Sequence, residues 1–464
     1  MVVVGGGIAG LVAALDLLDQ PDAPIVTVLE QADAVGGKLR AGALDDLGHD
    51  AGAESLLVTR PEAAELAERV GLGADLVTPR TTTASIWSRG RLRPLPRRTV
   101  LGVPADLRAL ADAGILSLPG LLRVPLDRCL PGSAPTADVA VGSYVAARLG
   151  RQVVDRLVDP LLGGVYAGSA DNLSLQATMP ALFAGVRQDR SLLGAASKVT
   201  TGQRSGPVFA GIAGGVSRLA QSTAERVRLA GGQIRTATTV VGLARVGDRW
   251  RLSVRGGLEL GPTVEADAVV LAVPAPAASR LLQAVVPTAA ADLADVELAS
   301  VALIAMAFPH DAASWPDGSG FLVPAVEGSA VKAVTLLSAK WGWVADQDRQ
   351  RRVVRASVGR WGDAGLLQRD DDDLVELVVA ELRRFLGVVA PPLAASVTRW
   401  GGALPQYAVG HVARVARIRA AVATQPGLAV CGATYDGVGI PAVIASAHLA
   451  ARQVRGSVEP SGRM

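Results

Sequence analysis

The chain has few of the residues that build metal sites, disulfide frameworks and aromatic cages. Its 464 residues include two cysteines, Cys129 and Cys431, which lie far apart and show no metal-ligand spacing. The four histidines form no cluster, so we expect no protein-bound metal. Two unpaired cysteines favour a reduced, cytoplasmic setting. Aromatic residues make up only 3% of the chain, which argues against a site built from paired aromatic rings.

An excess of one charge and long apolar runs are also missing. The chain has 46 basic and 43 acidic residues and a net charge of +3, a balance that argues against a nucleic-acid partner. No run of about 18 apolar residues without a charge occurs, so we expect no membrane span. The first apolar segment begins at Met1, which leaves no room for a cleavable signal. The stretch GILSLPGLLRVPLDRCL is expected to pack in the core, with a peripheral membrane contact as the alternative.

Lysine is the rarer of the two strong cations. It occurs only at Lys38, Lys198, Lys332 and Lys340, so nearly all the positive charge is guanidinium. Arginine suits the recognition of carboxylates.

A glycine cluster at the start of the chain carries the clearest functional signal. Residues 2–4 are expected to form a buried strand and residues 8–18 a helix, with Gly5, Gly7 and Gly10 in the turn between them. Gly5 permits the tight turn, Gly7 lets the backbone approach a pyrophosphate, and Gly10 lets the helix pack on the strand. The pattern predicts a dinucleotide at the helix N-terminus.

Two further segments complete this prediction. The segment PIVTVLE is expected to form a second strand that ends at Glu30, where a carboxylate can accept hydrogen bonds from a ribose diol. Another glycine-rich turn lies near the other end of the chain, in LAVCGATYDGVGIPAVIASAHLAARQV. Two such turns so far apart predict a discontinuous cofactor domain with the substrate region inserted between its parts.

Several stretches resemble one group of flavoproteins. The opening turn and LEQADAVGGKL are similar to the two-dinucleotide-binding-domain flavoproteins, which include amine oxidases, phytoene desaturases and porphyrinogen oxidases. VDPLLGGVYAGSADNLSLQATMPAL, ALPQYAVGHVARVARI and CGATYDGVGIPAVIASAHLAA resemble the protoporphyrinogen and coproporphyrinogen oxidase family, and most of all its Gram-positive-type coproporphyrinogen III oxidases. The resemblance runs from Met1 to about Arg455.

The resemblance implies an α/β fold, a Rossmann-like two-dinucleotide-binding-domain flavoprotein. Its discontinuous FAD-binding domain would comprise residues 1–57, 207–288 and 395–464. A mixed-sheet substrate-binding domain would comprise residues 58–100 and 289–394. Residues 101–206, which alternate helical periodicity with proline breaks, would form a helical insertion domain.

The resemblance also implies the residues of the site. FAD would be bound non-covalently, and no side chain would be catalytic because the flavin does the chemistry. The residues implied to contact FAD are Gly5, Gly6, Gly7, Ile8, Ala9, Gly10, Glu30, Gly36, Gly37, Lys38, Gly52, Ala53, Glu54, Ser55, Val240, Trp400, Gly432, Val438, Gly439 and Ile440. Tyr166 and Gly168 would line the substrate cavity, and Arg97 is an expected partner for a substrate carboxylate.

The implied reaction is the six-electron oxidation of coproporphyrinogen III to coproporphyrin III in haem biosynthesis. Flavin N5 would accept hydride from a bridging carbon, and oxygen would reoxidise the flavin with release of hydrogen peroxide. The protein would supply position, electrostatics and exclusion of water. Transfer of the product to a ferrochelatase is left open.

Three other functions remain as alternatives. Protoporphyrinogen IX oxidase is the nearest, because it uses the same fold on a related substrate. A flavin amine oxidase would require paired aromatics before the flavin. A non-enzymatic binding protein similar to the GDP-dissociation inhibitors would lose the phosphate-binding pattern, which this chain keeps in Gly5, Gly7, Gly10 and Glu30.

Overall fold

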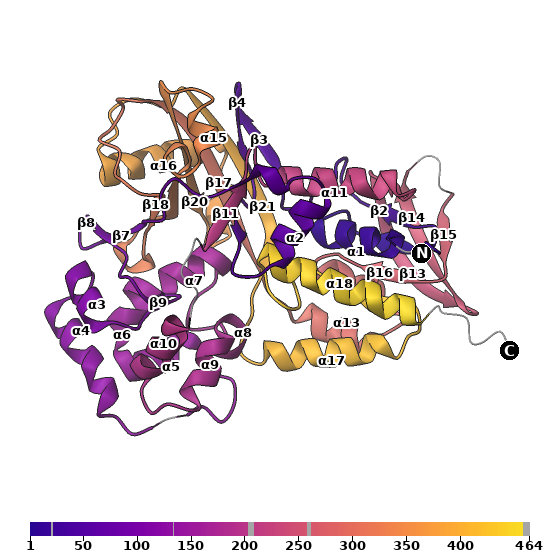
Figure 1. The fold of residues 1–464 in the computed structure, drawn as a ribbon, viewed down its shortest axis with the longest axis horizontal. Coiled ribbons are helices and arrows are strands. Elements are labelled where there is room, and N and C mark those ends of the chain that lie inside the picture. Colours follow the sequence, from indigo (N-terminus) through magenta and orange to yellow (C-terminus); the bar gives the residue numbers. More distant parts are fainter. Residues whose placement is uncertain (20–21, 133, 203–207, 258–260, 458–464) are drawn as a thin grey trace.

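The computed structural model describes residues 1–19, 22–132, 134–202, 208–257 and 261–457. Figure 1 shows three parts: an α/β part that contains the N-terminus, a part built on a large sheet, and a part made of helices. The predicted boundary between residues 206 and 207 and the predicted tail 458–464 lie outside the described residues.

The α/β part is built on a five-stranded parallel sheet with the order β12, β2, β1, β16, β22. Its strands are β1 (Val2–Val4), β2 (Thr27–Leu29), β12 (Gln233–Arg235), β16 (Val269–Leu271) and β22 (Leu428–Val430). In register, Val3 of β1 lies opposite Val28 and Val270. Parallel strands covered on both faces are expected to be apolar throughout, which accounts for these short runs of valine and leucine.

Helices cover both faces of this sheet (Figure 1). Val3 faces a core shared with α1 (Ile8–Leu18), α2 (Glu62–Arg69), α11 (Ser217–Leu229) and α18 (Ile440–Gly456). Val2 and Val4 face the opposite core, shared with α12 (Ala275–Leu282), α13 (Pro287–Ala294), α17 (His411–Ala423) and an antiparallel sheet. That sheet comprises β13 (Thr238–Val246), β14 (Arg249–Gly256) and β15 (Thr263–Ala266).

The second part is a seven-stranded mixed sheet with the order β21, β17, β20, β19, β18, β7, β8. Its strands are β7 (Ser85–Ser88), β8 (Arg91–Pro94), β17 (Leu298–Pro309), β18 (Gly320–Leu322), β19 (Val331–Leu336), β20 (Arg351–Val358) and β21 (Ala394–Pro405). Helix α16 (Asp371–Leu386) packs on it, because Leu374, Val378 and Leu382 recur every four residues along one buried face.

The third part is helical, as the periodicity of residues 101–200 predicts. Its helices are α3 (Leu107–Ala113), α4 (Leu118–Arg123), α5 (Val141–Leu149), α6 (Arg151–Val153), α7 (Asp159–Tyr166), α8 (Leu175–Thr178), α9 (Pro180–Val186) and α10 (Leu192–Thr201). The apolar stretch around α4 is only partly in the core. Ile115 and Val124 are buried, whereas Leu118, Leu122 and Leu126 are exposed.

Shorter elements connect the three parts. They are β3 (Ala41–Leu44), β4 (Leu47–Asp50), β5 (Leu56–Leu57), β6 (Leu76–Val77), β9 (Thr99–Val100), β10 (Val103–Pro104), β11 (Phe209–Ile212), α14 (Leu337–Lys340) and α15 (Gly342–Ala345).

The packing departs from the predicted domain division in three places. Helix α2 lies in the stretch 58–100 predicted to bind substrate, yet Leu66 packs in the core with α1 and α18. Helix α13 crosses the predicted boundary between residues 288 and 289, and it packs in the other core of the α/β part. Strand β21 crosses the predicted boundary at residue 395 and pairs with β17 as far as Pro405. The hydrogen-bonded ladder of β21 continues past that point, so the strand belongs to the large sheet.

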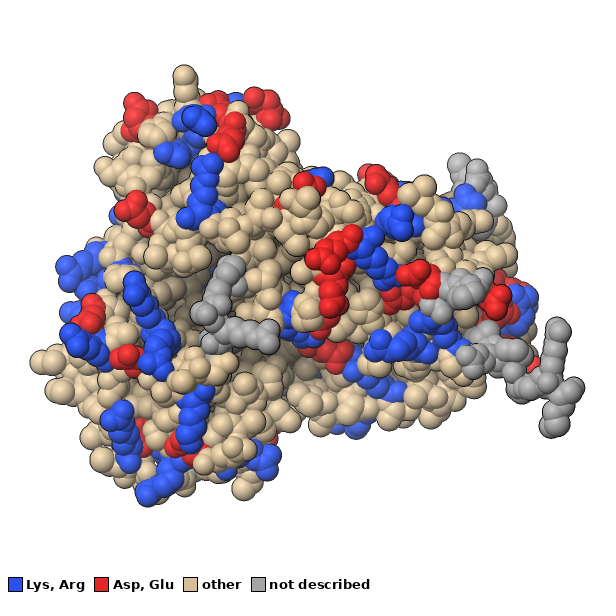
Figure 2. All heavy atoms as spheres, viewed as in Figure 1, with Lys and Arg blue, Asp and Glu red and all other residues tan. Residues whose placement is uncertain are grey.

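The surface carries both signs of charge. Figure 2 shows acidic and basic side chains interspersed over the face that it draws, as the balanced composition predicts. Within the described residues, no helix combines the length and the apolar composition needed to cross a membrane.

Candidate active site

The turn between β1 and α1 has the geometry that the glycine pattern predicts. Gly5 has a φ of +106°, and a Cβ there would lie 2.5 Å from the carbonyl oxygen of Ala272. A Cβ at Gly10 would lie 1.9 Å from the carbonyl oxygen of Gly5, whereas a Cβ at Gly7 would meet nothing within 4 Å. Gly7 is the N-cap residue of α1, and no side chain caps the helix there. The start of α1 therefore offers a turn of the kind that binds phosphate.

Glu30 lies directly against this turn. Its Oε2 accepts a hydrogen bond from the backbone N–H of Gly6 at 2.5 Å, and its Oε1 accepts one from Ala32 at 2.8 Å. The backbone N–H of Thr238 donates to the carbonyl oxygen of Glu30, which brings the start of β13 to the same place. Val240 follows two residues later, half-buried and paired with β14. The structure thus places Glu30 and Val240 on neighbouring segments.

The loop after Glu30 packs on the glycine turn. The backbone N–H of Gly36 donates to the carbonyl oxygen of Gly6 at 2.9 Å, and a Cβ at Gly37 would lie 3.2 Å from Cα of Gly7. Lys38 comes next, and burial lowers the pKa of its ammonium group. A half-buried cation beside a phosphate-binding turn is suited to an anionic ligand.

The segment around residue 52 packs beside the loop that contains Lys38, and together they form the predicted flavin wall. The backbone N–H of Ala53 donates to the carbonyl oxygen of Lys38 at 3.1 Å. The indole N–H of Trp400 donates to the carbonyl oxygen of Ala51 at 2.9 Å, and the Trp400 ring lies against Gly52. Two stretches far apart in the sequence, both predicted to contact the flavin, are therefore in direct contact.

The Glu54 carboxylate is engaged inside the protein. It accepts a hydrogen bond from Lys340 Nζ at 2.7 Å and forms an ion pair with Arg355 at 3.1 Å. Burial opposes the ionisation of Glu54, but the charges of Arg355 and Lys340 lower its pKa overall. Arg355 also donates to the backbone oxygens of Asp50 and Gly52. The two cations, which the sequence did not single out, hold the loop that ends at the half-buried Ser55.

The C-terminal glycine turn lies at the start of α18, which packs beside α1 (Figure 1). Gly432 has a φ of +121°, and a Cβ there would meet nothing within 4 Å. Gly439 is the N-cap residue of α18, again with no side-chain cap. Tyr407 donates its hydroxyl hydrogen to the carbonyl oxygen of Ala433 at 2.5 Å. The other predicted contact residues near the two helix starts are Ile8, Ala9, Val438 and Ile440.

Tyr166 and Gly168 flank a turn that docks on the end of β21. Ala167 between them has a φ of +52°. Gln406 donates to the carbonyl oxygen of Tyr166 at 2.7 Å, and a Cβ at Gly168 would lie 2.1 Å from Gln406 Oε1. Burial raises the pKa of the Tyr166 hydroxyl to about 12. Arg97 is exposed in the segment between β8 and β9.

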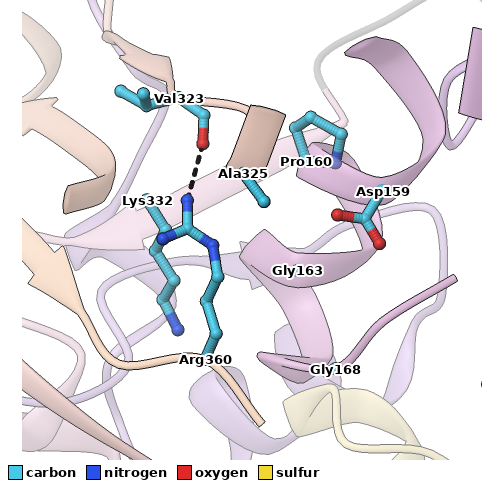
Figure 3. A pocket seen from close by; sticks show the side chains of 8 residues that line it. All are labelled: Asp159, Pro160, Gly163, Gly168, Val323, Ala325, Lys332 and Arg360. Carbon is cyan, nitrogen blue, oxygen red and sulfur yellow. Dashed lines mark hydrogen bonds between the residues drawn. The ribbon is translucent and has the colours of Figure 1, made fainter. Parts of the chain in front are cut away.

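A small cavity of about 20 Å³, with room for one or two water molecules, opens beside Gly168 (Figure 3). It lies between α7 and the large sheet, and its walls are Asp159, Pro160, Gly163, Gly168, Val323, Ala325, Lys332 and Arg360. Lys332 and Arg360 were missed as site residues. The available signal was a lysine inside an apolar strand, in a chain that has only four lysines.

Among the residues that the structure describes, no histidine is hydrogen-bonded to a serine or a cysteine. His448 lies 2.5 Å from Asp16, and His310 lies 2.5 Å from Arg352, so neither contacts a serine or a cysteine there. Within the described ranges, no group of three or more His, Cys, Asp or Glu residues is placed to hold a metal ion.

Comparison with known proteins identifies the family. Residues 8–455 match the family model of the flavin containing amine oxidoreductases. The chain belongs to this family. A coproporphyrinogen III oxidase of Mycobacterium leprae is 38% identical to this oxidoreductase, with 98% of both chains covered. The coproporphyrinogen III oxidase of Bacillus subtilis is 31% identical, with 95% and 94% covered.

A chloroplast protoporphyrinogen oxidase of Spinacia oleracea is less similar, at 27% identity, with 98% of this chain and 83% of the relative covered. Among solved structures, a protoporphyrinogen oxidase-type chain from Exiguobacterium is 30% identical, covers 98% of both chains and has a TM-score of 0.87. Cyclohexylamine oxidase from Brevibacterium oxydans has a TM-score of 0.69 at 16% identity, with 99% of both chains covered, a likeness of fold. The fold and the flavin oxidoreductase class predicted from the sequence are confirmed.

The residues present fit a dinucleotide flavin. Gly7 and Gly432 both leave open space where a side chain would lie. The N-cap residues of α1 and α18 are Gly7 and Gly439, and neither helix has a side-chain cap there. Backbone N–H groups of both helix starts are therefore available to an anionic or polar cofactor.

Proposed function

We propose that this flavin oxidoreductase is an FAD-dependent coproporphyrinogen III oxidase that uses oxygen as its acceptor. The proposal rests on full-length similarity to coproporphyrinogen III oxidases at 31–38% identity. The geometric observation that supports the proposal is a series of contacts that connects the glycine turn at α1 with the pocket beside Gly168. Trp400 links the two, because it lies against Gly52 and packs in one apolar cluster with Ala167.

The chain's own residues would hold FAD at three points. The start of α1 at Gly7 would bind the pyrophosphate, with Lys38 adding positive charge. Glu30 would accept hydrogen bonds from the adenosine ribose. The turn from Gly432 to Gly439 would lie along the flavin. Binding would be non-covalent, because burial raises the pKa of the only cysteine near this turn, Cys431, to about 12 and leaves it an unreactive thiol.

Bound FAD would supply the hydride acceptor, and oxygen would take the electrons onward. The protein would position the macrocycle and keep water away from it. Tyr166 and Tyr407 are both buried, with ring centroids 5.5 Å apart, and form an apolar wall next to Gly168. Neither hydroxyl is acidic, because burial raises both pKa values above the ordinary value of 10. A site without a nucleophile suits an oxidation in which position and environment are the protein's share.

The substrate is tested by supplying two porphyrinogens separately. Purified, FAD-loaded protein is mixed with coproporphyrinogen III or with protoporphyrinogen IX, and the fluorescence of the porphyrin formed is followed over time. We expect coproporphyrinogen III to be oxidised with the higher kcat/KM and hydrogen peroxide to accumulate. Turnover of protoporphyrinogen IX alone would reassign the protein to the nearest alternative.

The setting of the reaction is also proposed. Both cysteines, Cys129 at the surface and Cys431 in the core, are free thiols, which fits a cytoplasmic protein. A porphyrin product would pass to a metal-inserting enzyme, and direct hand-off to a ferrochelatase is testable by co-purification. Arg97 remains a proposed carboxylate contact.

A further inference from the structure

The pocket beside Gly168 is unusual in its charge. Lys332 on β19 is only 7% exposed, and its side chain lies next to that of Arg360, just after β20 (Figure 3). Within the described part of the chain, neither cation forms an ion pair. The Arg360 guanidinium donates hydrogen bonds to the backbone carbonyl oxygens of Ser329 and Val323, both at 2.9 Å.

The acidic groups near the pocket act on Arg360 and not on Lys332. Asp159 on α7 lies across from the cations in Figure 3, and one of its oxygens accepts the backbone N–H of Ala170 at 2.9 Å. Burial raises the pKa of Asp159, against the opposing effects of the Ala170 hydrogen bond and of the Arg360 charge. Asp159 and Asp363 both act on Arg360 through their charge, but for Lys332 the neighbouring charge that matters is the like charge of Arg360.

Two neighbouring cations removed from water are costly unless an anion joins them. Buried groups perturbed in this way concentrate at ligand sites. A carboxylate is the anion that suits the pair, since guanidinium and ammonium groups both form short charge-assisted hydrogen bonds with it. The size of the pocket agrees, because a cavity of about 20 Å³ excludes a tetrapyrrole and admits one or two groups the size of a water molecule, such as the two oxygens of a carboxylate.

The pocket is connected to the predicted flavin wall. The backbone N–H of Trp361 donates to the carbonyl oxygen of Ala167 at 2.8 Å, which ties the Arg360 segment to the turn before Gly168. Trp361 and Ala167 share an apolar cluster with Trp400, whose ring lies against Gly52. A substituent held in the pocket would therefore belong to a molecule that lies along this wall.

We propose that Lys332 and Arg360 form a receptor for one propionate carboxylate of the porphyrinogen, and that Lys332 favours substrates with four carboxylates over those with two. This inference rests on the proposed function. Coproporphyrinogen carries four propionates and protoporphyrinogen carries two. A cationic pocket that binds one of the additional propionates of coproporphyrinogen would therefore favour it over protoporphyrinogen. The step is binding alone, and no bond is made or broken there.

The test compares Lys332→Met, which removes the charge at similar length, with Lys332→Arg, which keeps it. Lys198→Met is the matched control, because Lys198 is exposed in the helical part and pairs with Asp189. Two quantities are measured on FAD-loaded protein: KM and kcat for coproporphyrinogen III, and Kd for the products coproporphyrin III and protoporphyrin IX from fluorescence. Product binding separates a lost carboxylate contact from a general loss of activity.

We expect Lys332→Met to raise KM and the Kd of coproporphyrin III by about tenfold, a typical cost of a lost charge-assisted contact. We expect kcat to change by less than about threefold, and the Kd of protoporphyrin IX to change less than that of coproporphyrin III. Lys332→Arg should recover most of the affinity, and Lys198→Met should match the wild type.

The outcomes separate the two proposals. If the wild type oxidises coproporphyrinogen III and Lys332→Met has the same KM and Kd, the pocket is not the carboxylate receptor, although the proposed function stands. If the wild type oxidises neither porphyrinogen and binds neither product, the proposed function itself fails. A fall in kcat with KM unchanged would assign Lys332 a structural role instead.

Discussion

Lys332→Met should stabilise the free protein while it weakens substrate binding. In the folded chain, burial and the charge of Arg360 lower the pKa of Lys332 from 10.5 to about 7. At about 1.4 kcal/mol per pH unit, this corresponds to roughly 5 kcal/mol of unfavourable free energy when the group is charged. Methionine is close to lysine in length and adapts to irregular apolar space, so it removes the charge without leaving a large cavity.

The effect depends on pH in a defined direction. Below pH 7, Lys332 is protonated in both the folded and the unfolded chain, so the folded state carries the full unfavourable free energy of the buried charge. Between pH 7 and 10.5 the unfolded chain keeps a proton that the folded chain has lost, so this group makes wild-type stability rise with pH. The advantage of Lys332→Met should therefore be about 4 kcal/mol at pH 7 and about 2 kcal/mol at pH 9.

The assay is denaturant unfolding of wild type, Lys332→Met and Lys198→Met at pH 7 and at pH 9, without a porphyrin. The free energy of unfolding of Lys198→Met should lie within about 0.5 kcal/mol of the wild-type value at both pH 7 and pH 9, because the substitution removes only a surface ion pair. Adding coproporphyrin III should then stabilise the wild type more than Lys332→Met, since a ligand stabilises the state that it binds. A Lys332→Met protein less stable than the wild type at pH 7 would show that the ammonium already has a partner, and would refute the reasoning.

Further predictions concern the glycine turn, the buried cysteine and the buried histidines. Gly7→Val should fold but bind FAD at least about tenfold more weakly, whereas Gly10→Val should lower the melting temperature, because its Cβ would lie 1.9 Å from a backbone oxygen; equal FAD titrations of Gly7→Val and wild type would contradict this. Acid precipitation should release all flavin, since the Cys431 thiol is buried, and a yellow pellet would refute non-covalent binding. His49 and His411 have pKa values lowered by burial from 6.5 to about 4, so protonation favours the unfolded chain and stability should fall as pH drops from 6.5 towards 4, by about 3 kcal/mol for each. Melting temperatures measured across that range check this, and a flat profile would contradict it.

The nucleotide turn could be predicted from the sequence because its determinants are local. The strand, the glycines and the helix occupy residues 2–18, and the steric reasons for Gly5 and Gly10 lie within that unit and its immediate neighbours. Glu30 follows at a fixed distance along the next strand. The C-terminal glycine turn was also predicted from the sequence, whereas its individual flavin contacts were assigned by resemblance. The position of this turn beside the first one depends on the packing of α18 against α1.

The division into domains was predicted less well, because the apolar pattern of a helix or strand does not show which other element it packs against. Helix α2 has one apolar face containing Leu66, and that face fits a helical layer of either part equally well. Strand β21 has the length to continue to Pro405, but only its pairing with β17 shows which sheet it joins. Boundaries between parts depend on such long-range contacts, which the pattern of a single segment does not contain.

The lysines show how a rare residue type carries information that motifs do not. In a chain whose cations are almost all arginine, three of the four lysines are buried or half-buried. Lys38 lies at the nucleotide turn, Lys340 holds Glu54, and Lys332 lies in the pocket with Arg360. Buried lysine differs from buried arginine in one respect, because only lysine can lose its proton near neutral pH.

This difference explains why a lysine, and not a second arginine, suits the position beside Arg360. Two arginines would carry two charges at all times, and the free protein would bear the full cost of holding them together out of water. With Lys332 at a pKa of about 7, the resting pocket can hold one permanent charge on Arg360 and one ammonium that is only partly protonated. An arriving carboxylate favours the protonated form, so the second charge is completed by the ligand. The free protein is thus less strained than a pair of arginines would make it, and the bound carboxylate still meets two cations.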